Sequence, residues 1–236
     1  MDKINTVVVG YGGMGKYHAD NISKFENFNL LGIYDIKEER CEVARENNVK
    51  AYDSFEAVLA DEKVELIVCA TYNDCHKDIA IRAMRAGKNV ISEKPVTMCS
   101  EDLAEMIKVS EETGKLFTVH QNRRFDVDFL AMKQIHDSGE IGKVMNIESR
   151  VHGQNGVVHG WREFKVAGGG MLFDWGVHQI DQIIDMMGDE KVVSVYANLH
   201  SVRTPEVDDY YKLIFRFANG TTAHVETSTY TLIQQP

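Results

Sequence analysis

The stretch "VVVGYGGMG", residues 7–15, decides the fold of the N-terminal half. Its three valines form a short apolar run that is typical of a strand buried on both faces. Gly10, Gly12 and Gly15 follow with the spacing GxGxxG, and helical spacing begins at Met14. Between a strand and a helix, such glycines allow a tight turn, close approach of a pyrophosphate and close helix packing. The stretch therefore predicts a dinucleotide-binding turn, with a glycine-rich turn that binds nothing as the alternative.

Around this turn, apolar runs alternate with helical stretches as far as residue 120. The predicted strands are 4–10, 29–35, 65–71, 88–93 and 116–119, and the predicted helices are 14–24, 37–47, 75–86 and 101–113. Strand and helix in this alternation predict an α/β fold with a doubly wound parallel sheet of the Rossmann type. We expect this dinucleotide-binding domain to span residues 1–121.

Residues 122–236 have a different rhythm and are expected to form an α+β domain. Helical spacing appears at 126–136 and 171–187, whereas 143–153, 192–202, 208–220 and 221–233 alternate apolar and polar residues. Alternation of this kind is typical of half-exposed antiparallel strands, so we predict a largely antiparallel sheet. "FANGTT" is expected to be its hairpin turn, with positive φ at both Asn219 and Gly220.

The composition favours a cytoplasmic protein that binds small molecules. The chain has 236 residues, of which 44% are hydrophobic, enough for two modest cores. A net charge of −10 argues against binding to nucleic acid or to an anionic membrane. The N-terminal apolar run is too short for a signal sequence or a membrane span. The four cysteines show no metal-ligand or disulfide spacing, which indicates reduced thiols: Cys41, Cys69, Cys75 and Cys99.

Asp35 ends the second predicted strand, about twenty residues after the glycines. A carboxylate there can accept hydrogen bonds from the ribose diol of NAD and would repel the 2′-phosphate of NADP. NAD is therefore the predicted cofactor, although the nearby Lys37 and Arg40 leave NADP as the less favoured choice. A carboxylate that merely caps a surface turn is the alternative interpretation of Asp35.

Two further segments follow strands and should lie at the carboxyl edge of the sheet, where open α/β sheets bind their ligands. They are "ATYNDCH", residues 70–76, and "SEKPVT", residues 92–97. Pro95 restricts the backbone and presents Lys94 from a stiff segment. A lone loop lysine is usually a solvated surface residue, but the position beside a dinucleotide site makes Lys94 a candidate functional residue.

"GGGMLFDWGVHQIDQII", residues 168–184, places Asp174 and His178 four residues apart on one face of a predicted helix. A surface pair is the ordinary interpretation of such spacing. Asp174, His178 and Asp181 could instead supply metal ligands. Because the segment lacks the second histidine of HExxH, we predict no metal site.

The glycine fingerprint, "EKP", "QNRRF" and "GGGMLFDWGVHQID" together resemble the Gfo/Idh/MocA family of nicotinamide-dependent sugar and polyol oxidoreductases, from residue 1 to about residue 230. The resemblance implies that Lys94, Asp174 and His178 are catalytic. Tyr72 stands where the family usually has proline, which puts the course of the loop under the cofactor in doubt. Family members usually continue beyond this chain, so we expect an incomplete second domain, in a chain that is either a fragment or a naturally short member. The residues expected to bind the cofactor are Gly10, Gly12, Gly13, Met14, Gly15, Asp35, Thr71, Asn73, His76, Glu93, Gln121, Trp161 and Arg162.

The predicted reaction is hydride transfer between NAD and a secondary alcohol of a sugar or an inositol-like cyclic polyol. His178 would accept the hydroxyl proton, Asp174 would orient its imidazole, and Lys94 would stabilise charge on the oxygen. The three glycines would leave room for substrate and nicotinamide. Two alternatives stay open, namely a redox-neutral enzyme that retains NAD while modifying a sugar, and a non-catalytic dinucleotide-binding sensor. The resemblance also implies a homo-oligomer, either a dimer or a tetramer.

Overall fold

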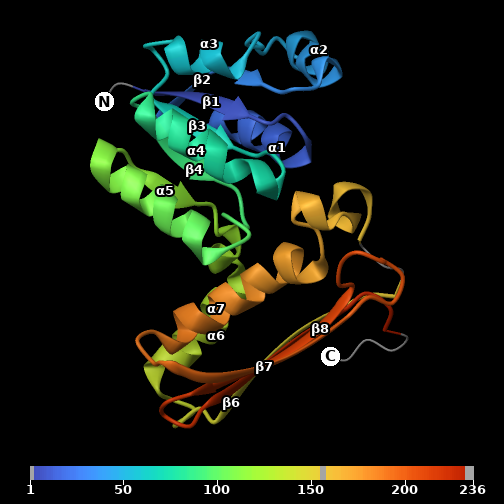
Figure 1. The fold of residues 1–236 in the computed structure, drawn as a ribbon. Coiled ribbons are helices and arrows are strands. Elements are labelled where there is room, and N and C mark those ends of the chain that lie inside the picture. The colour runs from blue at the N-terminus through green and yellow to red at the C-terminus, as the bar shows by residue number, and fades with distance from the viewer. Residues whose placement is uncertain (1–2, 155–157, 232–236) are drawn as a thin grey trace. The chain divides into compact units, whose positions relative to one another are not determined.

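The computed structural model describes residues 3–154 and 158–231, and the chain divides into two compact units (Figure 1). The first unit is Met1–His120 and the second is Gln121–Pro236. Within the described ranges, no helix is both long and apolar enough to cross a bilayer.

The first unit contains a parallel sheet, as predicted, and its strand order is β2-β1-β3-β4-β5. Ala51 forms a parallel bridge with Ile33 of β2, on the side away from β1. With that short sixth segment, the order becomes the 3-2-1-4-5-6 arrangement of dinucleotide-binding sheets. The strands are β1 (Ile4–Val9), β2 (Phe28–Tyr34), β3 (Leu66–Cys69), β4 (Asn89–Ser92) and β5 (Phe117–Val119).

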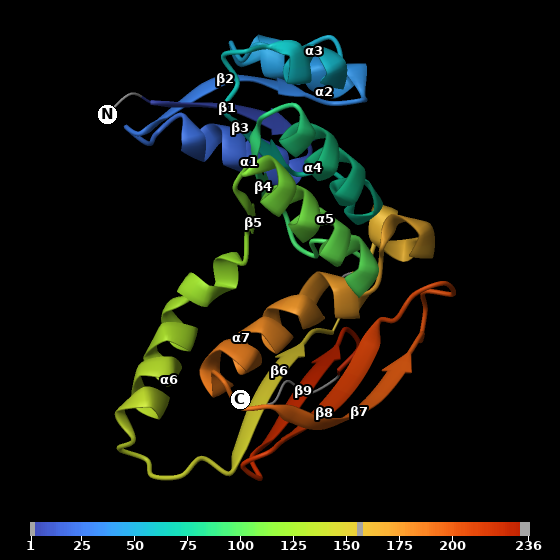
Figure 2. The ribbon, with the colours of Figure 1, turned by 60° about the vertical axis from the view of Figure 1, so that its left-hand side comes forward.

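Helices cover both faces of this sheet (Figure 2). Successive residues of β1 point to opposite faces, so Val8 packs with α1 and α2, while Val7 and Val9 pack with α3, α4 and α5. The helices are α1 (Gly13–Ile22), α2 (Glu38–Glu46), α3 (Phe55–Ala60), α4 (His76–Arg85) and α5 (Ser100–Thr113), with a 3₁₀ turn, η1, at Asn73–Cys75. The short α3 was not predicted.

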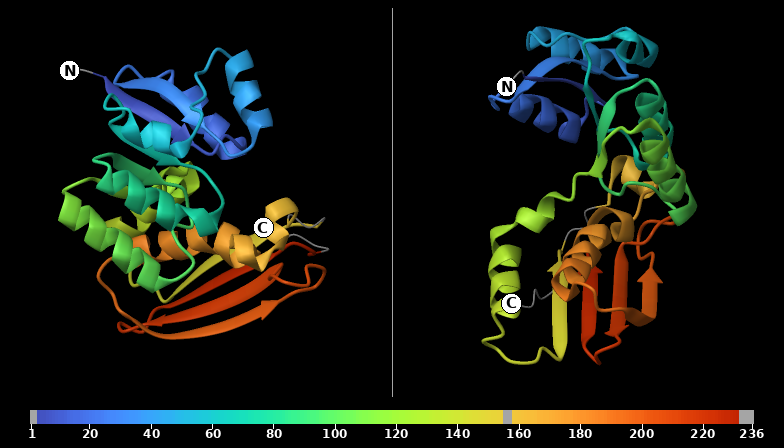
Figure 3. Two further views of the ribbon diagram at one scale, coloured as in Figure 1. Left: turned by 45° about the horizontal axis from the view of Figure 1, so that its top comes forward. Right: turned by 90° about the vertical axis from the view of Figure 1, so that its left-hand side faces the viewer.

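The second unit contains a four-stranded sheet in the order β6-β9-β8-β7 (Figure 3). Its strands are β6 (Asn146–His152), β7 (Val192–His200), β8 (Tyr210–Phe217) and β9 (Thr222–Ser228). The prediction of a largely antiparallel sheet is confirmed, but β6 pairs with β9 in parallel. Alternating hydrophobicity indicates a half-buried strand and carries no information on its direction. Residues 232 and 233 of the last predicted strand lie outside the described residues.

Helix α7 (Val177–Met187) packs on one face of this sheet through Ile183 and Met187. The buried sheet residues in contact with it come mainly from β8 and β9, such as Leu213 and Val225. β7 is exposed along most of its length, so its predicted half-burial is wrong. The remaining elements are η2 (Asn122–Phe125), α6 (Val127–Ser138), η3 (Gly160–Glu163), η4 (Lys165–Ala167) and a π-helical turn, η5 (Leu172–Gly176).

The π turn corrects the prediction of one regular helix over 171–187. Asp208 holds its start, because the carbonyl oxygen of Asp208 accepts from Met171 N at 3.0 Å and its Oδ2 accepts from Leu172 N at 2.8 Å. Gly176 lies against Tyr211, where a Cβ atom would come within 2.7 Å of Leu172 Cδ1. Such turns are frequent at functional sites, and this one carries Asp174.

Candidate active site

The glycine turn between β1 and α1 contains two kinds of glycine. At some positions a side chain would collide with the fold, and at others there is room for one. Gly10 has φ of +91°, and a Cβ atom there would lie 2.6 Å from the carbonyl oxygen of Ala70. A Cβ atom on Gly15 would overlap the carbonyl of Gly10. By contrast, a Cβ atom on Gly13 would meet nothing within 4 Å, and one on Gly12 would make only ordinary contacts. Gly12 and Gly13 therefore leave bare backbone beside the turn.

The N-terminus of α1 suits an anionic ligand. Gly12 is the N-cap residue and provides no side-chain cap to the first N–H groups of the helix. Unsatisfied N–H groups and the helix dipole favour a phosphate at this position. Met14, which is 41% exposed, borders the same turn. The donor set and the open backbone therefore fit the pyrophosphate of a dinucleotide.

Asp35, at the end of β2, is already engaged by three donors of the protein. Its Oδ2 accepts from Tyr11 N at 2.6 Å and from Arg40 Nη1 at 3.0 Å, and its Oδ1 accepts from Lys37 N at 2.9 Å. The Asp35 side chain is only 2% exposed, whereas that of Arg40 is 31% exposed. The ion pair with Arg40 was not predicted, and it places a guanidinium beside the carboxylate expected to select NAD.

The loops after β3 and β4 meet at the carboxyl edge of the sheet, as expected from parallel strands. Glu93 N donates to the carbonyl of Cys69 at 2.9 Å. His76 joins the two loops, with Nδ1 at 2.9 Å from the carbonyl of Pro95 and Nε2 at 3.3 Å from that of Thr71. Lys94, half-buried, is presented from this doubly held segment.

His76 and Asn73, both predicted to bind cofactor, are buried in the first unit. Burial lowers the pKa of His76, which favours a neutral imidazole. The contacts recorded for His76 are to backbone carbonyls of the two loops, so the structure gives it a supporting place in the site. Its role toward the cofactor stays a prediction, as does that of Asn73.

Glu93 is the centre of a cluster that sequence reasoning missed. Its carboxylate is hydrogen-bonded by His18 of α1 and by His120, which directly follows β5. A signal for each histidine exists in the sequence. His18 occupies the same helical face as the buried residues Gly15 and Ile22, and His120 ends a strand at the ligand-binding edge.

In the second unit, the predicted residues Asp174 and Arg162 form an ion pair. Arg162 Nε donates to Asp174 Oδ2 at 2.9 Å, and the two side chains are 32% and 17% exposed. The guanidinium also lies over the ring of Trp161, 4.5 Å from its centroid. Three predicted residues of this unit are thus brought together, on η3 and the π turn.

His178 lies in the first turn of α7 and is 6% exposed. Its ring meets that of Trp175 edge-on, with 6.2 Å between the centroids. Asp181, which the alternative metal site would require, instead forms a two-fold hydrogen bond with Arg124, from Nε at 2.8 Å and from Nη2 at 2.7 Å. Asp181 is thereby engaged by a cation of its own unit.

The glycines before the π turn are explained by packing within the unit. Gly168 and Gly170 have positive φ. A Cβ atom on Gly169 would collide with the carbonyl oxygen of Arg162, and one on Gly170 would collide with the carboxylate of Asp208. The sequence predicted that these glycines leave room for a ligand. The collisions show a second reason for them, which is close packing within the unit.

Gln121 begins the second unit, and its Oε1 is buried with no hydrogen-bond partner among the residues described. A buried acceptor of this kind is available to a ligand.

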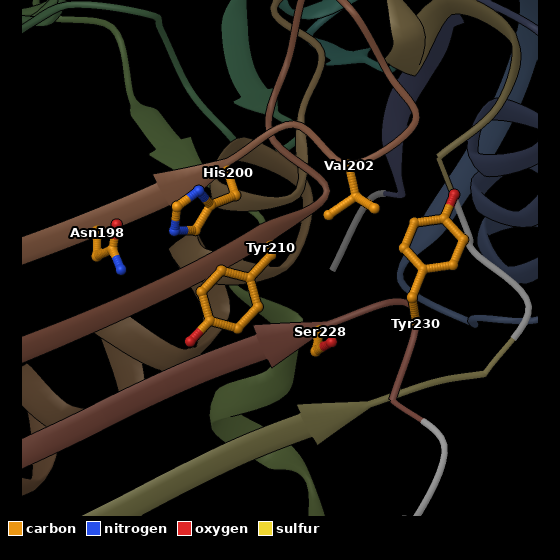
Figure 4. A pocket seen from close by; sticks show the side chains of 6 residues that line it. All are labelled: Asn198, His200, Val202, Tyr210, Ser228 and Tyr230. Carbon is orange, nitrogen blue, oxygen red and sulfur yellow. The ribbon is translucent and has the colours of Figure 1, made fainter.

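A separate pocket of about 390 Å³ lies on the sheet of the second unit and contains none of the predicted site residues (Figure 4). It is lined by Asn198, His200, Val202, Tyr210, Ser228 and Tyr230.

Two family models together match almost the whole chain. Residues 4–121 match the oxidoreductase family with an NAD-binding Rossmann fold, and residues 129–235 match the GFO/IDH/MocA C-terminal domain. The chain belongs to the Gfo/Idh/MocA oxidoreductase family. The resemblance, the fold class and the NAD-binding character of the first domain are thereby confirmed.

This Gfo/Idh/MocA chain is similar to oxidoreductases from several organisms. An uncharacterised oxidoreductase of Schizosaccharomyces pombe is 33% identical, over 92% of this chain and 61% of its own length. The NADP⁺-dependent scyllo-inositol 2-dehydrogenase of Bacillus subtilis is 29% identical, over 90% of this chain and 60% of its own length. The chain thus spans about six tenths of these relatives.

A crystal structure of an NAD-binding protein from Listeria innocua matches the Gfo/Idh/MocA chain with a TM-score of 0.96 and 48% identity. The match covers 100% of this chain and 69% of the other. The fold described above is therefore one found in a solved relative. The catalytic and cofactor-binding roles of individual residues stay predictions.

Proposed function

We propose that this protein is an NAD-dependent dehydrogenase that oxidises a secondary alcohol of a sugar or cyclic polyol. The main observation in support is the position of Lys94 at the carboxyl edge of an NAD-binding sheet. His76 connects the loop of Lys94, through Pro95, to the loop of Thr71. That second loop packs on the glycine turn, where Ala70 lies against Gly10. The similarity to a scyllo-inositol dehydrogenase supports an inositol-like substrate.

Cofactor binding would use features of the first unit. The backbone at Gly12 and Gly13 and the N-terminus of α1 would hold the pyrophosphate, and Asp35 would accept hydrogen bonds from the ribose diol. NAD, when bound, supplies the hydride acceptor. The similarity to an NADP⁺-dependent relative keeps NADP as the second choice.

Proton transfer is assigned to the second unit and charge stabilisation to Lys94. The imidazole of His178 accepts the hydroxyl proton, since an imidazole has the pKa range that a base needs at neutral pH. Asp174, fixed by Arg162, stabilises the imidazolium that forms. The ammonium of Lys94 donates to the hydroxyl oxygen and stabilises the negative charge that develops there.

The first experiment is a substrate panel with wild-type protein and His178→Ala. We expect NAD reduction with one class of polyol or aldose, and a loss of kcat of about 10²–10⁴ in the variant with unchanged NAD affinity. The matched control is His159→Ala, because His159 is an exposed histidine of the same unit. Loss of NAD binding in His178→Ala would contradict the assignment of His178 as the base.

The same experiment separates the two rival functions. Silence across the panel while NAD binds normally would contradict the dehydrogenase proposal. NAD that co-purifies with the protein and remains oxidised during turnover of a sugar would favour the redox-neutral enzyme. Reversible NAD binding with no turnover of any sugar would favour the sensor.

We also propose a homo-oligomer that acts in the cytoplasm. Exposed apolar side chains along β7 support an assembly, because monomeric proteins rarely expose contiguous apolar patches. The side chains concerned are Val195 and Leu199, which share one face of the strand. Free cysteines, of which Cys75 and Cys99 are exposed, are typical of a reducing compartment. Sedimentation of the purified protein tests the assembly.

A further inference from the structure

The segment "SEKP", residues 92–95, is fixed on both sides of Lys94 by histidines, of which His18 and His76 are buried and His120 is half-buried. Upstream, the carboxylate of Glu93 is bonded to His18 and His120. Downstream, the carbonyl of Pro95 is bonded to His76. All five residues belong to the first unit, so their geometry is that of one compact body.

The upstream contact is a shared carboxylate. Glu93 Oε1 lies 2.7 Å from His18 Nε2 and 3.0 Å from His120 Nδ1, while Oε2 accepts from Lys94 N at 3.2 Å. Burial raises the pKa of Glu93, but the hydrogen bonds from His120 and His18 outweigh it and hold the pKa at about 2. The ionised carboxylate can only accept, so both imidazole nitrogens donate to it.

The downstream contact has a defined direction as well. His76 is fully buried, and burial lowers its pKa, so the ring is neutral and carries a single N–H. Nδ1 is 2.9 Å from the carbonyl of Pro95, whereas Nε2 is 3.3 Å from that of Thr71. The shorter distance assigns the N–H to Nδ1, which donates to Pro95.

We propose that Glu93 is a positioning residue for Lys94, with its carboxylate tied by His18 to α1 and by His120 to the end of β5. His76 holds the other side of the same segment. This inference rests on the proposed function, in which Lys94 touches the reacting oxygen. A lysine side chain is long and flexible, and a displacement of about 1 Å can reduce a rate by about a hundredfold. Rigid backbone on both sides reduces that displacement.

A divalent cation is the rival interpretation of the same three residues. One ligand atom each from His18, Glu93 and His120 lies within 4.8 Å of the others. However, both histidine nitrogens lie at hydrogen-bond distance from a single oxygen, Glu93 Oε1. A hydrogen-bonded carboxylate accounts for that arrangement without an ion, and zinc binding becomes an outcome of the test.

A double-mutant cycle tests the proposal in the purified protein. We expect Glu93→Gln to lower kcat by about tenfold to a hundredfold with little change in KM or NAD affinity. A loss of NAD affinity instead would overturn the positioning role in favour of the cofactor-binding role that the sequence predicted for Glu93. Lys94→Ala should lower kcat further. Because Glu93 acts through Lys94, the double variant should be no slower than Lys94→Ala alone. Fully additive losses would overturn the positioning role.

The cycle also separates this proposal from the proposed function. Wild-type activity in Lys94→Ala would overturn the catalytic role of Lys94 itself. If Lys94→Ala lowers kcat as expected, but the losses of kcat from Lys94→Ala and Glu93→Gln add fully in the double variant, only the positioning role of Glu93 would be overturned. His120→Leu is the second variant, because the side chain of His120 is 30% exposed, whereas that of Glu93 is 8% exposed. His120→Gln keeps a donor and should restore part of the rate that His120→Leu loses.

A readout without substrate completes the test. The acetylation rate of Lys94, followed by peptide mass spectrometry, should change several-fold in Glu93→Gln, while that of the exposed Lys108 on α5 stays constant. An unchanged rate at Lys94 would overturn the proposal. Stoichiometric zinc binding that is lost in His120→Leu would also overturn it, in favour of a metal site.

Discussion

At the scale of single residues, the pair Asp35–Arg40 sets the choice between NAD and NADP. Asp35→Asn removes the charge that repels a 2′-phosphate and releases Arg40 from its ion pair. We expect the ratio of NADP to NAD affinity to rise by about tenfold, equivalent to about 1.4 kcal/mol. Fluorescence titration of the protein with NADH and NADPH measures both affinities.

Arg40→Met in the Asp35→Asn background is the matched control. If Arg40 supplies the new phosphate contact, this second change should remove the gain in NADP affinity and leave NAD affinity unchanged. Tyr11 N and Lys37 N donate to different oxygens of Asp35, so the amide introduced by Asp35→Asn keeps an acceptor for only one of these two N–H groups. Equal losses for both cofactors would mean that Asp35 only holds the turn.

At the scale of elements, Gln179 joins α7 to three strands of its sheet. Its Nε2 donates to the carbonyl oxygen and to Oγ of Ser149, both at 3.0 Å, and its Oε1 accepts from Thr227 at 2.9 Å and from Tyr211. Gln179→Leu leaves buried hydroxyls short of a partner, which costs about 1–3 kcal/mol of unfolding free energy. Urea denaturation measures that loss.

The exposed Gln134 of α6 provides the comparison for Gln179. Gln134→Leu should change the free energy of unfolding by less than about 0.5 kcal/mol, as surface substitutions usually do. Equal effects of the two changes would show that the buried network around Gln179 does not hold α7 in place. A selective loss in Gln179→Leu would show that the buried network holds the first turn of α7, which also carries His178.

Most elements were predictable because their signals are local, and the exceptions depend on distant contacts. The alternation of strands and helices predicted the parallel sheet, but the parallel pairing of β6 follows from partners far along the chain. The "FANGTT" turn was placed correctly, yet positive φ occurs at Gly220 and not at Asn219. The π turn depends on Asp208, which no helical pattern around Asp174 reveals.

The same distinction holds for the candidate site. Asp35 and Lys94 follow strands, so the rule for the carboxyl edge of a parallel sheet identified them. The hydrogen bonds of Glu93 to His18 and His120 link residues 75 and 27 positions apart. Local patterns place His18 on the buried face of its helix and His120 at the ligand-binding edge, but they do not show that both side chains meet Glu93, because only the folded sheet and α1 bring them together.

At the scale of the whole molecule, hydrogen exchange with and without NAD tests the predicted cofactor residues of both units. Saturation at about a hundred times Kd stabilises the bound form by about 2.7 kcal/mol, which slows exchange of amides that open with the site by about a hundredfold. We expect this protection in the glycine turn of the first unit and at Trp161 and Arg162 in η3 of the second.

Peptides from β7 are the internal reference, because that strand carries none of the predicted cofactor residues. Protection of the glycine turn alone would contradict the cofactor roles of Trp161 and Arg162 while leaving those of Gly12 and Gly13 in place. Uniform protection that includes β7 would mean that NAD suppresses a global opening, since a local contact slows only the amides near it. Selective protection of the turn and η3 therefore requires that the cofactor engage residues of both units.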